Sequence, residues 1–329
     1  MMLSLTELCA KLLEGAGPVK TVLFRVDAGR LHGLSFGHLS RCILLSQTLR
    51  AQGTKTALLM RDIQEGVEHA RGQNERVLPP TTEVMRQENV QVLVIDLPYE
   101  PEQDVLAEAR NRGMWIVYLD DTGRSHIKAD LVLNTSILTE PTMYPNVSRT
   151  LLGLDYFFMN PDDLALASHS RPTPDSALPP SVVMTFGGSD PTGLTLQALA
   201  ALERYRFPIR LDVVLGPGFA YIDEVQDVAA RIAARVLVSP PRLIPIFQAA
   251  ELVICAGGRT LYECHALGIP ALAVASTPNE SEHISAFLRR GLLLEGLMEW
   301  NEENFVRALN KMLHTYRHEK RKEKQRYEA

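Results

Sequence analysis

The chain has 329 residues, a mass of 36.6 kDa and a formal net charge of −5 at pH 7; 46% of its residues are hydrophobic, 22% charged and 6% aromatic. This composition is typical of a globular protein and excludes a disordered one. The length suggests two domains. The small acidic excess argues against a dedicated nucleic-acid-binding protein, and no apolar stretch is long enough for a membrane-spanning helix.

The chain begins with a stretch that mixes apolar and charged residues. The residues from Met1 to Glu14 lack the basic start and small-residue cleavage site of a secretory signal. They predict an amphipathic surface helix, which could offer an apolar face to a lipid or protein and leaves peripheral membrane contact open. The four cysteines show no zinc-ligand spacing. We therefore expect reduced thiols, no structural metal and a cytoplasmic protein.

Short β-rich runs alternate with longer helical patterns along the chain. Several runs are almost continuously apolar, as parallel strands covered on both faces are. The pattern predicts an α/β fold of two doubly wound, Rossmann-like domains facing each other across a cleft. The expected strands are Thr21–Val26, Val92–Leu97, Trp115–Asp120, Leu131–Asn134, Val182–Phe186, Leu211–Leu215, Arg235–Val238, Leu252–Cys255 and Ala271–Ala275.

A proline-rich stretch divides the chain. Four prolines lie between residues 172 and 180 among small polar residues, which is typical of a linker. We expect a first domain over 1–165, a linker over 166–180, a second domain over 181–315 and a charged tail over 316–329. The tail from Arg317 has six basic and three acidic residues. It predicts a solvated helical end, with a nucleic-acid or membrane patch as the alternative.

The first expected strand runs into a polar, glycine-containing segment. Arg25 and Asp27 lie at its end, and Gly37, His38 and Arg41 follow where a helix is expected from about Leu39. In open α/β sheets ligands bind at the edge formed by the carboxyl ends of the strands, where these residues are expected. The positive helix terminus disfavours an imidazolium, so His38 could act there as a neutral general base. The alternative is a histidine in the first turn of a helix with no ligand.

Two further glycine-rich turns follow strands in the second half. Gly187, Gly188 and Ser189 precede one helix, and the two glycines could let the backbone approach a phosphate. The turn lacks the lysine of a P-loop and the full GxGxxG spacing, and a tight turn with no ligand is the alternative. Gly257 and Gly258 precede a helix expected from about Thr260, with Glu263 in its first turn. The N–H groups of this second turn could hold a diphosphate while Glu263 accepts hydrogen bonds from a ribose diol. The alternative is a carboxylate that only favours the helix dipole.

Other polar residues are expected to lie near the cleft. The pair Asp120–Asp121 suggests a metal site, but no third ligand recurs at fixed spacing, so a structural or substrate-hydroxyl role is favoured. His283 alone is more often a surface histidine. The residues concerned are Asp96, Tyr99, Asp120, Asp121, Asn279, Glu280 and His283.

The ordered motifs FRVDAG, GHxxRC, VIDLPY, YLDD, ADLVLN, LLGLDYFF, VVMTFGGSDP, ICAGGRTLYE and STPNE resemble a known family. They are similar to those of the UDP-sugar hydrolases of pseudaminic acid biosynthesis and the related spore-coat polysaccharide proteins. The resemblance runs from about Val19 to about Leu293. It implies the two-domain GT-B fold of inverting glycosyltransferases such as the lipid II enzyme. It also implies that His38 activates water and that the segment from Gly257 to Glu263 holds UDP.

The favoured hypothesis is the activity that the resemblance implies: a hydrolase, without metal or cofactor, that releases UDP from a 2,4-diacetamido-2,4,6-trideoxyhexose. His38 and Tyr99 are the expected catalytic residues. An inverting glycosyltransferase with a UDP-sugar donor is the alternative, and a nucleotide-sugar-binding protein without turnover is a third. The expected sugar-binding residues are Arg25, Asp27, Gly37, Arg41, Asp96, Asn279 and Glu280. The expected nucleotide-binding residues are Gly187, Gly188, Ser189, Gly257, Gly258, Thr260 and Glu263.

Overall fold

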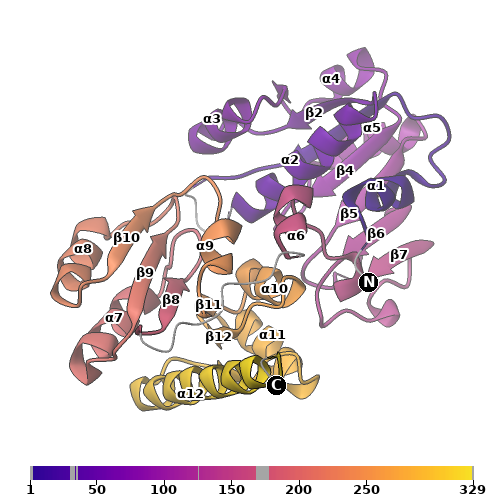
Figure 1. The fold of residues 1–329 in the computed structure, drawn as a ribbon. Helices are drawn as coiled ribbons and strands as arrows, with labels where there is room; N and C mark the ends of the chain where they lie inside the picture. The colour runs from indigo at the N-terminus through magenta and orange to yellow at the C-terminus, as the bar shows by residue number, and fades with distance from the viewer. Residues whose placement is uncertain (1–2, 30–33, 35, 125, 168–177, 328–329) are drawn as a thin grey trace. The chain divides into compact units, whose positions relative to one another are not determined.

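The computed structural model describes residues 3–29, 34, 36–124, 126–167 and 178–327, with side chains described up to residue 315. The chain divides into two compact units, residues 1–161 and 162–329. Most of the expected linker, and Gly33 of the first glycine-containing segment, lie outside the described residues. Each unit is built on its own parallel sheet (Figure 1).

The first unit contains a parallel sheet of seven strands in the order β3-β2-β1-β4-β5-β6-β7. Its strands are β1 (Thr21–Val26), β2 (Lys55–Leu59), β3 (Val77–Leu78), β4 (Val92–Asp96), β5 (Trp115–Leu119), β6 (Leu131–Asn134) and β7 (Arg149–Leu152). Its helices are α1 (Leu5–Leu13), α2 (Phe36–Ala51), α3 (Gln64–Gly72), α4 (Thr82–Gln87) and α5 (Gln103–Asn111), with short 3-10 turns at Pro141–Met143 and Leu154–Tyr156.

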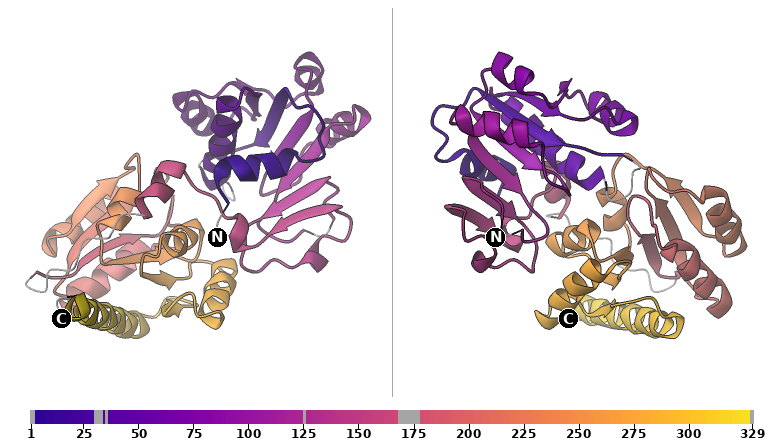
Figure 2. Two further views of the ribbon diagram at one scale, coloured as in Figure 1. Left: turned by 45° about the vertical axis from the view of Figure 1, so that its right-hand side comes forward. Right: turned by 180° about the vertical axis from the view of Figure 1, so that it is seen from behind.

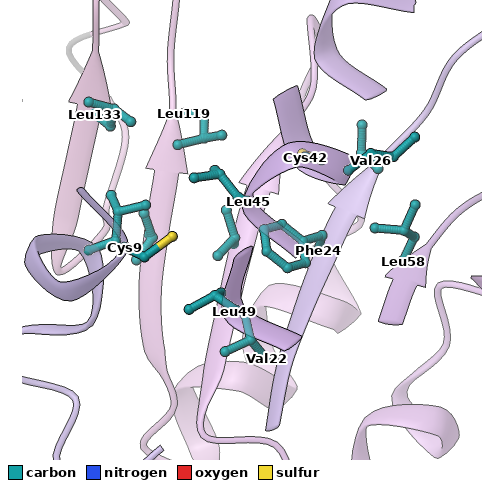
Figure 3. Packing of buried hydrophobic residues seen from close by; sticks show 14 of the residues in the cluster. Cys9, Val22, Phe24, Val26, Cys42, Leu45, Leu49, Leu58, Leu119 and Leu133 are labelled. Carbon is teal, nitrogen blue, oxygen red and sulfur yellow. The ribbon is translucent and has the colours of Figure 1, made fainter. Parts of the chain in front are cut away.

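Side chains of the first sheet alternate between two apolar cores. Val22 and Phe24 of β1 point toward α2, where they meet Leu45 and Leu49 (Figure 3). Leu23, between them in sequence, belongs to the core on the other face, together with side chains of α4 and α5. Because successive strand residues point to opposite faces, a strand buried on both faces must be apolar at almost every position. That explains the continuous apolar runs.

Helix α1 is amphipathic, as expected, but its apolar face is not available to a partner. Leu5, Leu8, Cys9 and Leu12 are buried in the same core as α2, against which α1 packs. Ser4 and the Glu7 side chain form a capping box at its start. The expectation that this helix offers an apolar surface to an acceptor is therefore wrong. In the described part of the chain, no helix is both long and apolar enough to cross a membrane.

The second unit contains a parallel sheet of six strands in the order β10-β9-β8-β11-β12-β13. Its strands are β8 (Ser181–Thr185), β9 (Arg210–Leu215), β10 (Arg235–Val238), β11 (Leu252–Ala256), β12 (Ala271–Val274) and β13 (Glu295–Leu297). Its helices are α6 (Pro161–Ala167, whose first residue belongs to the first unit), α7 (Leu194–Tyr205), α8 (Ile222–Arg231), α9 (Ile244–Gln248), α10 (Arg259–Ala266), α11 (Pro278–Arg289) and α12 (Glu302–Tyr327).

One face of the second sheet is covered by α7, α8 and α12, whose apolar side chains share a core with β8, β9, β11 and β12. Helix α12 packs along α7 (Figure 2). Helices α10 and α11 pack against β11 and β12. The nine strands expected from sequence are all present within one residue at each end, whereas β2, β3, β7 and β13 were not predicted. The predicted α/β class with two doubly wound sheets is confirmed.

Candidate functional site

Each sheet has a point where the strand order reverses, and several of the expected site residues lie beside it. In the first unit the chain goes from β1 to β2 on one side and later to β4 on the other. Asp27 follows β1 and Asp96 ends β4, so both lie at the carboxyl edge beside this point. In the second unit β8 and β11 are the corresponding neighbours. Ligands of open α/β sheets bind at such switch points.

His38 and Asp96 form the central pair of the first unit. The third residue of α2 is His38, and its Nδ1 lies 2.7 Å from Oδ1 of Asp96. Arg41, one helical turn later, donates two hydrogen bonds to the same carboxylate, from Nε to Oδ2 at 2.5 Å and from Nη2 to Oδ1 at 2.6 Å. Its Nη1 donates to Asp121 at 2.7 Å. The helix thus presents a histidine and an arginine to one buried carboxylate.

The charges around Asp96 determine which nitrogen of His38 carries the proton. Burial alone would raise the pKa of Asp96, but the charge of Arg41 and the hydrogen bonds from Arg41 and His38 hold it well below its usual range. A charged carboxylate can only accept, so the short contact requires a proton on Nδ1. In the neutral ring Nε2 is then the proton acceptor. An imidazole oriented in this way by a carboxylate is a competent general base.

A second polar cluster lies beside the first and contains Tyr99. Asp27 accepts hydrogen bonds from Arg25, from the Tyr99 hydroxyl, and from the backbone N–H and Nε of Arg61. The guanidinium of Arg61 also lies over the Tyr99 ring, 4.6 Å from its centroid. Glu102 binds Arg25 through both carboxylate oxygens. Opposite charges are paired throughout, which is how buried ions are tolerated.

The side chains of Arg25, Asp27 and Asp96 are fully buried. They offer no exposed surface in this structure for the direct contact with a sugar that the sequence led us to expect. Burial, followed by the hydrogen bond to Asp27, raises the pKa of Tyr99 to about 12. Its phenol is therefore protonated at neutral pH and cannot serve as a base there. Gly37 lies in the first turn of α2, next to His38.

In the second unit the turn after β8 is organised by a carboxylate of its own. Asp190 accepts hydrogen bonds from the backbone N–H groups of Leu194, at 2.9 Å, and Thr195, at 2.7 Å. It thereby occupies the N-terminus of α7. Gly187 has a φ of +85°, a conformation that favours glycine. The backbone donors expected to meet a phosphate here are thus those of residues 187–189 and not those of the helix.

The loop after β9 packs closely on this turn. A Cβ at Gly216 would lie 2.4 Å from the Cα of Gly188, and the N–H of Gly218 donates to the Gly188 carbonyl at 2.8 Å. Sequence reasoning missed this support. Its signal was the Gly-Pro-Gly immediately after a strand.

The turn after β11 leads into α10 without a carboxylate at the helix terminus. Gly258 is the N-cap and makes no side-chain cap hydrogen bond, and the first turn has no acidic residue. The helix begins at Arg259, so Glu263 lies one residue beyond the first turn where it was expected. Helical side chains lean toward the N-terminus, and Oε1 of Glu263 reaches Nε of Arg259 at 3.0 Å. Thr260 is half-buried in the first turn.

Helix α11 approaches the same turn. Oε2 of Glu280 accepts from the backbone N–H and hydroxyl of Ser276, and a Cβ at Gly257 would lie 2.7 Å from the Glu280 carbonyl. Asn279 is exposed in the first turn of α11. The expectation of a surface position for His283 is wrong: it is buried, with Nδ1 at 2.5 Å from the Tyr262 hydroxyl.

The paired aspartates have separate tasks. Asp120 is buried and accepts from the backbone of Gly123 and Arg124 and from the Tyr144 hydroxyl, so it organises its own loop. Asp121 is 42% exposed and pairs with Arg41. Among the residues that the structure describes, no three His, Cys, Asp or Glu side chains are grouped to hold a metal ion. Glu102, Arg61 and Arg259 were not predicted as parts of these clusters.

Comparison with known proteins gives distant relatives and a clear fold. No family model matches the chain. An uncharacterised protein of Methanocaldococcus jannaschii is 24% identical over 60% of this chain and 43% of its own length. The spore coat polysaccharide biosynthesis protein SpsG of Bacillus subtilis is 21% identical over 61% of this chain and 60% of its own. The match thus spans less than two thirds of either relative.

Solved structures match over almost the whole chain. MurG of Acinetobacter baumannii is similar with a TM-score of 0.59 and 14% identity, covering 91% of this chain and 95% of its own. Spinosyn rhamnosyltransferase SpnG complexed with thymidine diphosphate gives 0.60 and 14%, covering 92% and 94%. A protein described as a UDP-N-acetylglucosamine 2-epimerase from Listeria monocytogenes gives 0.50 and 12%, covering 90% and 88%. The fold is that of the GT-B glycosyltransferases.

Proposed function

We propose that the chain is a nucleotide-sugar hydrolase that releases UDP from a modified amino sugar of the 2,4-diacetamido-2,4,6-trideoxyhexose type, for surface-polysaccharide or nonulosonic acid biosynthesis. The observation that carries the proposal is the His38–Asp96 pair at the switch point of the first sheet. It supplies a histidine whose accepting nitrogen is fixed. A base of that kind is what the activation of water requires.

In the proposed reaction Nε2 of His38 takes a proton from water as the water oxygen attacks the anomeric carbon. The bond from that carbon to the diphosphate oxygen breaks, and its electron pair leaves with UDP. The free sugar carries the inverted configuration. The second unit would hold the departing diphosphate through backbone N–H groups of residues 187–189 and of the turn from Gly257 to Thr260, with Glu263 on the ribose. Helix termini and glycine turns can carry this charge without a metal ion.

The names of the similar proteins support a nucleotide-sugar substrate. One structure with this fold is a rhamnosyltransferase holding thymidine diphosphate, another is described as an epimerase of a UDP-sugar, and one relative belongs to spore coat polysaccharide biosynthesis. Water and an acceptor hydroxyl make the same demand on His38, so a transferase remains the competing activity. A transferase with a lipid or protein acceptor could have bound it on the apolar face of α1, but that face is buried in the core of the first unit.

The test is UDP release from a panel of UDP-amino sugars with no acceptor present. We expect turnover by the unmodified protein and a loss of about 10²–10⁴-fold in His38→Asn, the usual contribution of a general base. His126→Asn is the matched control, because this exposed histidine of the same unit also pairs with a carboxylate, Glu100. Release that appears only after a hydroxyl acceptor is added would replace the hydrolase with a transferase.

A further inference from the structure

Arg259 lies beside the turn that the proposed function assigns to the diphosphate, where a positive charge would pair with the phosphates. It is the first residue of α10, directly after Gly257 and Gly258, and its side chain is 32% exposed. Its Nε donates to Oε1 of Glu263, whose side chain is 15% exposed. The carboxylate that the proposed function assigns to the ribose is therefore already bound, in this structure, to the guanidinium beside the phosphate-binding turn.

The two helix termini of the second unit differ in their capacity for an anion. The N-terminus of α7 is occupied by the Asp190 carboxylate, which would repel a phosphate. The N-terminus of α10 has no such cap, but carboxylates of other residues lie near it. Glu263 is one, and Oε1 of Glu280 lies 3.4 Å from where a Cβ on Gly258 would be. A diphosphate entering this turn meets negative charge, which a guanidinium in the same turn offsets.

We propose that Arg259 is a phosphate-binding residue that exchanges partners: it holds Glu263 in this structure, and on nucleotide binding it pairs with the diphosphate while Glu263 turns to the ribose hydroxyls. The inference rests on the proposed function, because it assumes a nucleoside diphosphate at α10. It adds the residue that recognises the phosphates and links that recognition to the ribose.

In the proposed exchange, Glu263 and Arg259 each replace the partner that they lose with a new one. Burial raises the pKa of Glu263, with Arg259 opposing that rise, so a carboxylate that loses this partner needs other donors to stay charged. A ribose diol supplies two O–H donors to replace the one N–H donor that leaves. The guanidinium in turn gains phosphate oxygens, with which it can form two parallel hydrogen bonds. Diphosphate and ribose are therefore expected to bind better when joined than their separate affinities suggest.

Calorimetric titration with UDP and with uridine separates the roles of the two side chains. We expect Arg259→Gln to weaken UDP by about 10- to 100-fold, the loss of a charge-assisted hydrogen bond, and to change uridine by less than about threefold. Arg259→Lys should recover part of the UDP affinity. The matched control is Arg235→Gln, because Arg235 forms a similar exposed ion pair, with Asp212, at the amino end of β10. It should bind both ligands as the unmodified protein does.

Each other outcome has a definite meaning. An equal loss for UDP and uridine in Arg259→Gln would show that Arg259 only holds Glu263 in place, and an unchanged UDP affinity would show that it does not meet the phosphates; either overturns the inference while leaving the proposed function intact. If the unmodified protein binds neither UDP nor uridine, the proposed function itself fails. Far-ultraviolet circular dichroism of each variant ensures that lost binding is not lost folding.

Discussion

Replacing Asp96 with asparagine tests how the first unit orients its base. The amide keeps the size of the side chain but removes the charge that requires a proton on Nδ1 of His38. Asn can instead donate its N–H to Nδ1, which moves the proton to Nε2 and removes the acceptor. An exchange of this kind in a Ser-His-Asp triad lowers turnover about 10⁴-fold. We expect a fall in kcat of about 10²–10⁴-fold, with UDP affinity unchanged because the proposed nucleotide site lies in the other unit.

The same variant has a cost in stability that can be worked out from its contacts. Asp96 is fully buried and accepts two hydrogen bonds from N–H groups of Arg41. When the charge of Asp96 is removed, Asp121 is the carboxylate that still pairs with Arg41. Breaking a buried pair costs about 3–5 kcal/mol, and the remaining partner puts this one toward the lower end. Because folding lowers the pKa of Asp96, its contribution is complete above its unfolded value of about 3.9. This contribution is lost as the pH falls further, toward the pKa that Asp96 has in the folded protein. The difference in free energy of unfolding between the unmodified protein and Asp96→Asn should therefore narrow below about pH 4.

The assay pairs UDP-release kinetics with urea denaturation at pH 7 and at pH 3. Asp121→Asn is the matched control: it removes the same charge from the same arginine, but its side chain is 42% exposed. We expect it to cost less than about 1 kcal/mol. Turnover in Asp96→Asn within threefold of the unmodified protein would refute the assigned tautomer. A stability difference that stayed constant down to pH 3 would refute the electrostatic account of the pair.

Three further expectations follow from individual contacts. Glu263→Ala should weaken UDP by about 1.5–3 kcal/mol in calorimetry, and an unchanged affinity would remove Glu263 from the ribose. Glu75→Gln should lower the free energy of unfolding, measured in urea, by about 3 kcal/mol, because the buried carboxylate of Glu75 binds Arg50 and Ser46. The control is Glu88→Gln, at an exposed ion pair with Arg76, which should cost about 0–1 kcal/mol. Equal costs for the two variants would contradict the argument from burial. Activity should survive excess EDTA; loss on chelation that is restored by Mg²⁺ or Mn²⁺ would require a metal step.

The fold could be predicted wherever burial controls the sequence. Strands such as β1 and β11 are covered on both faces, so nearly every position is apolar and the run is easily recognised. The strand β2 was missed because its sequence KTALL is polar at the start and otherwise rich in helix formers. The strands β3 and β13 have two and three residues, too few for any pattern.

The candidate site was predictable in its positions but not in its contacts. His38 and Asp96 were each expected at a strand or helix end, yet they are 58 residues apart and nothing in the sequence pairs them. The same holds for Arg25 and Glu102, which are 77 residues apart. Nor does the sequence show that the carboxylate of Asp190 accepts the hydrogen bonds at the N-terminus of α7, beside the turn expected to hold a phosphate. The register of the sheet determines which of these distant residues lie close together, and that register depends on the packing of the whole domain.

The most direct test of the central claim is to follow the oxygen of water. The reaction is run in water enriched in ¹⁸O with a UDP-amino sugar and no acceptor, and both products are examined by mass spectrometry at early times. Attack by water at the anomeric carbon, activated by His38, predicts one ¹⁸O atom in the released sugar and none in UDP, with the rate of labelling reduced about 10²–10⁴-fold in His38→Asn. Label in the phosphate of UDP, or labelling of the sugar at an undiminished rate in His38→Asn, would contradict the account.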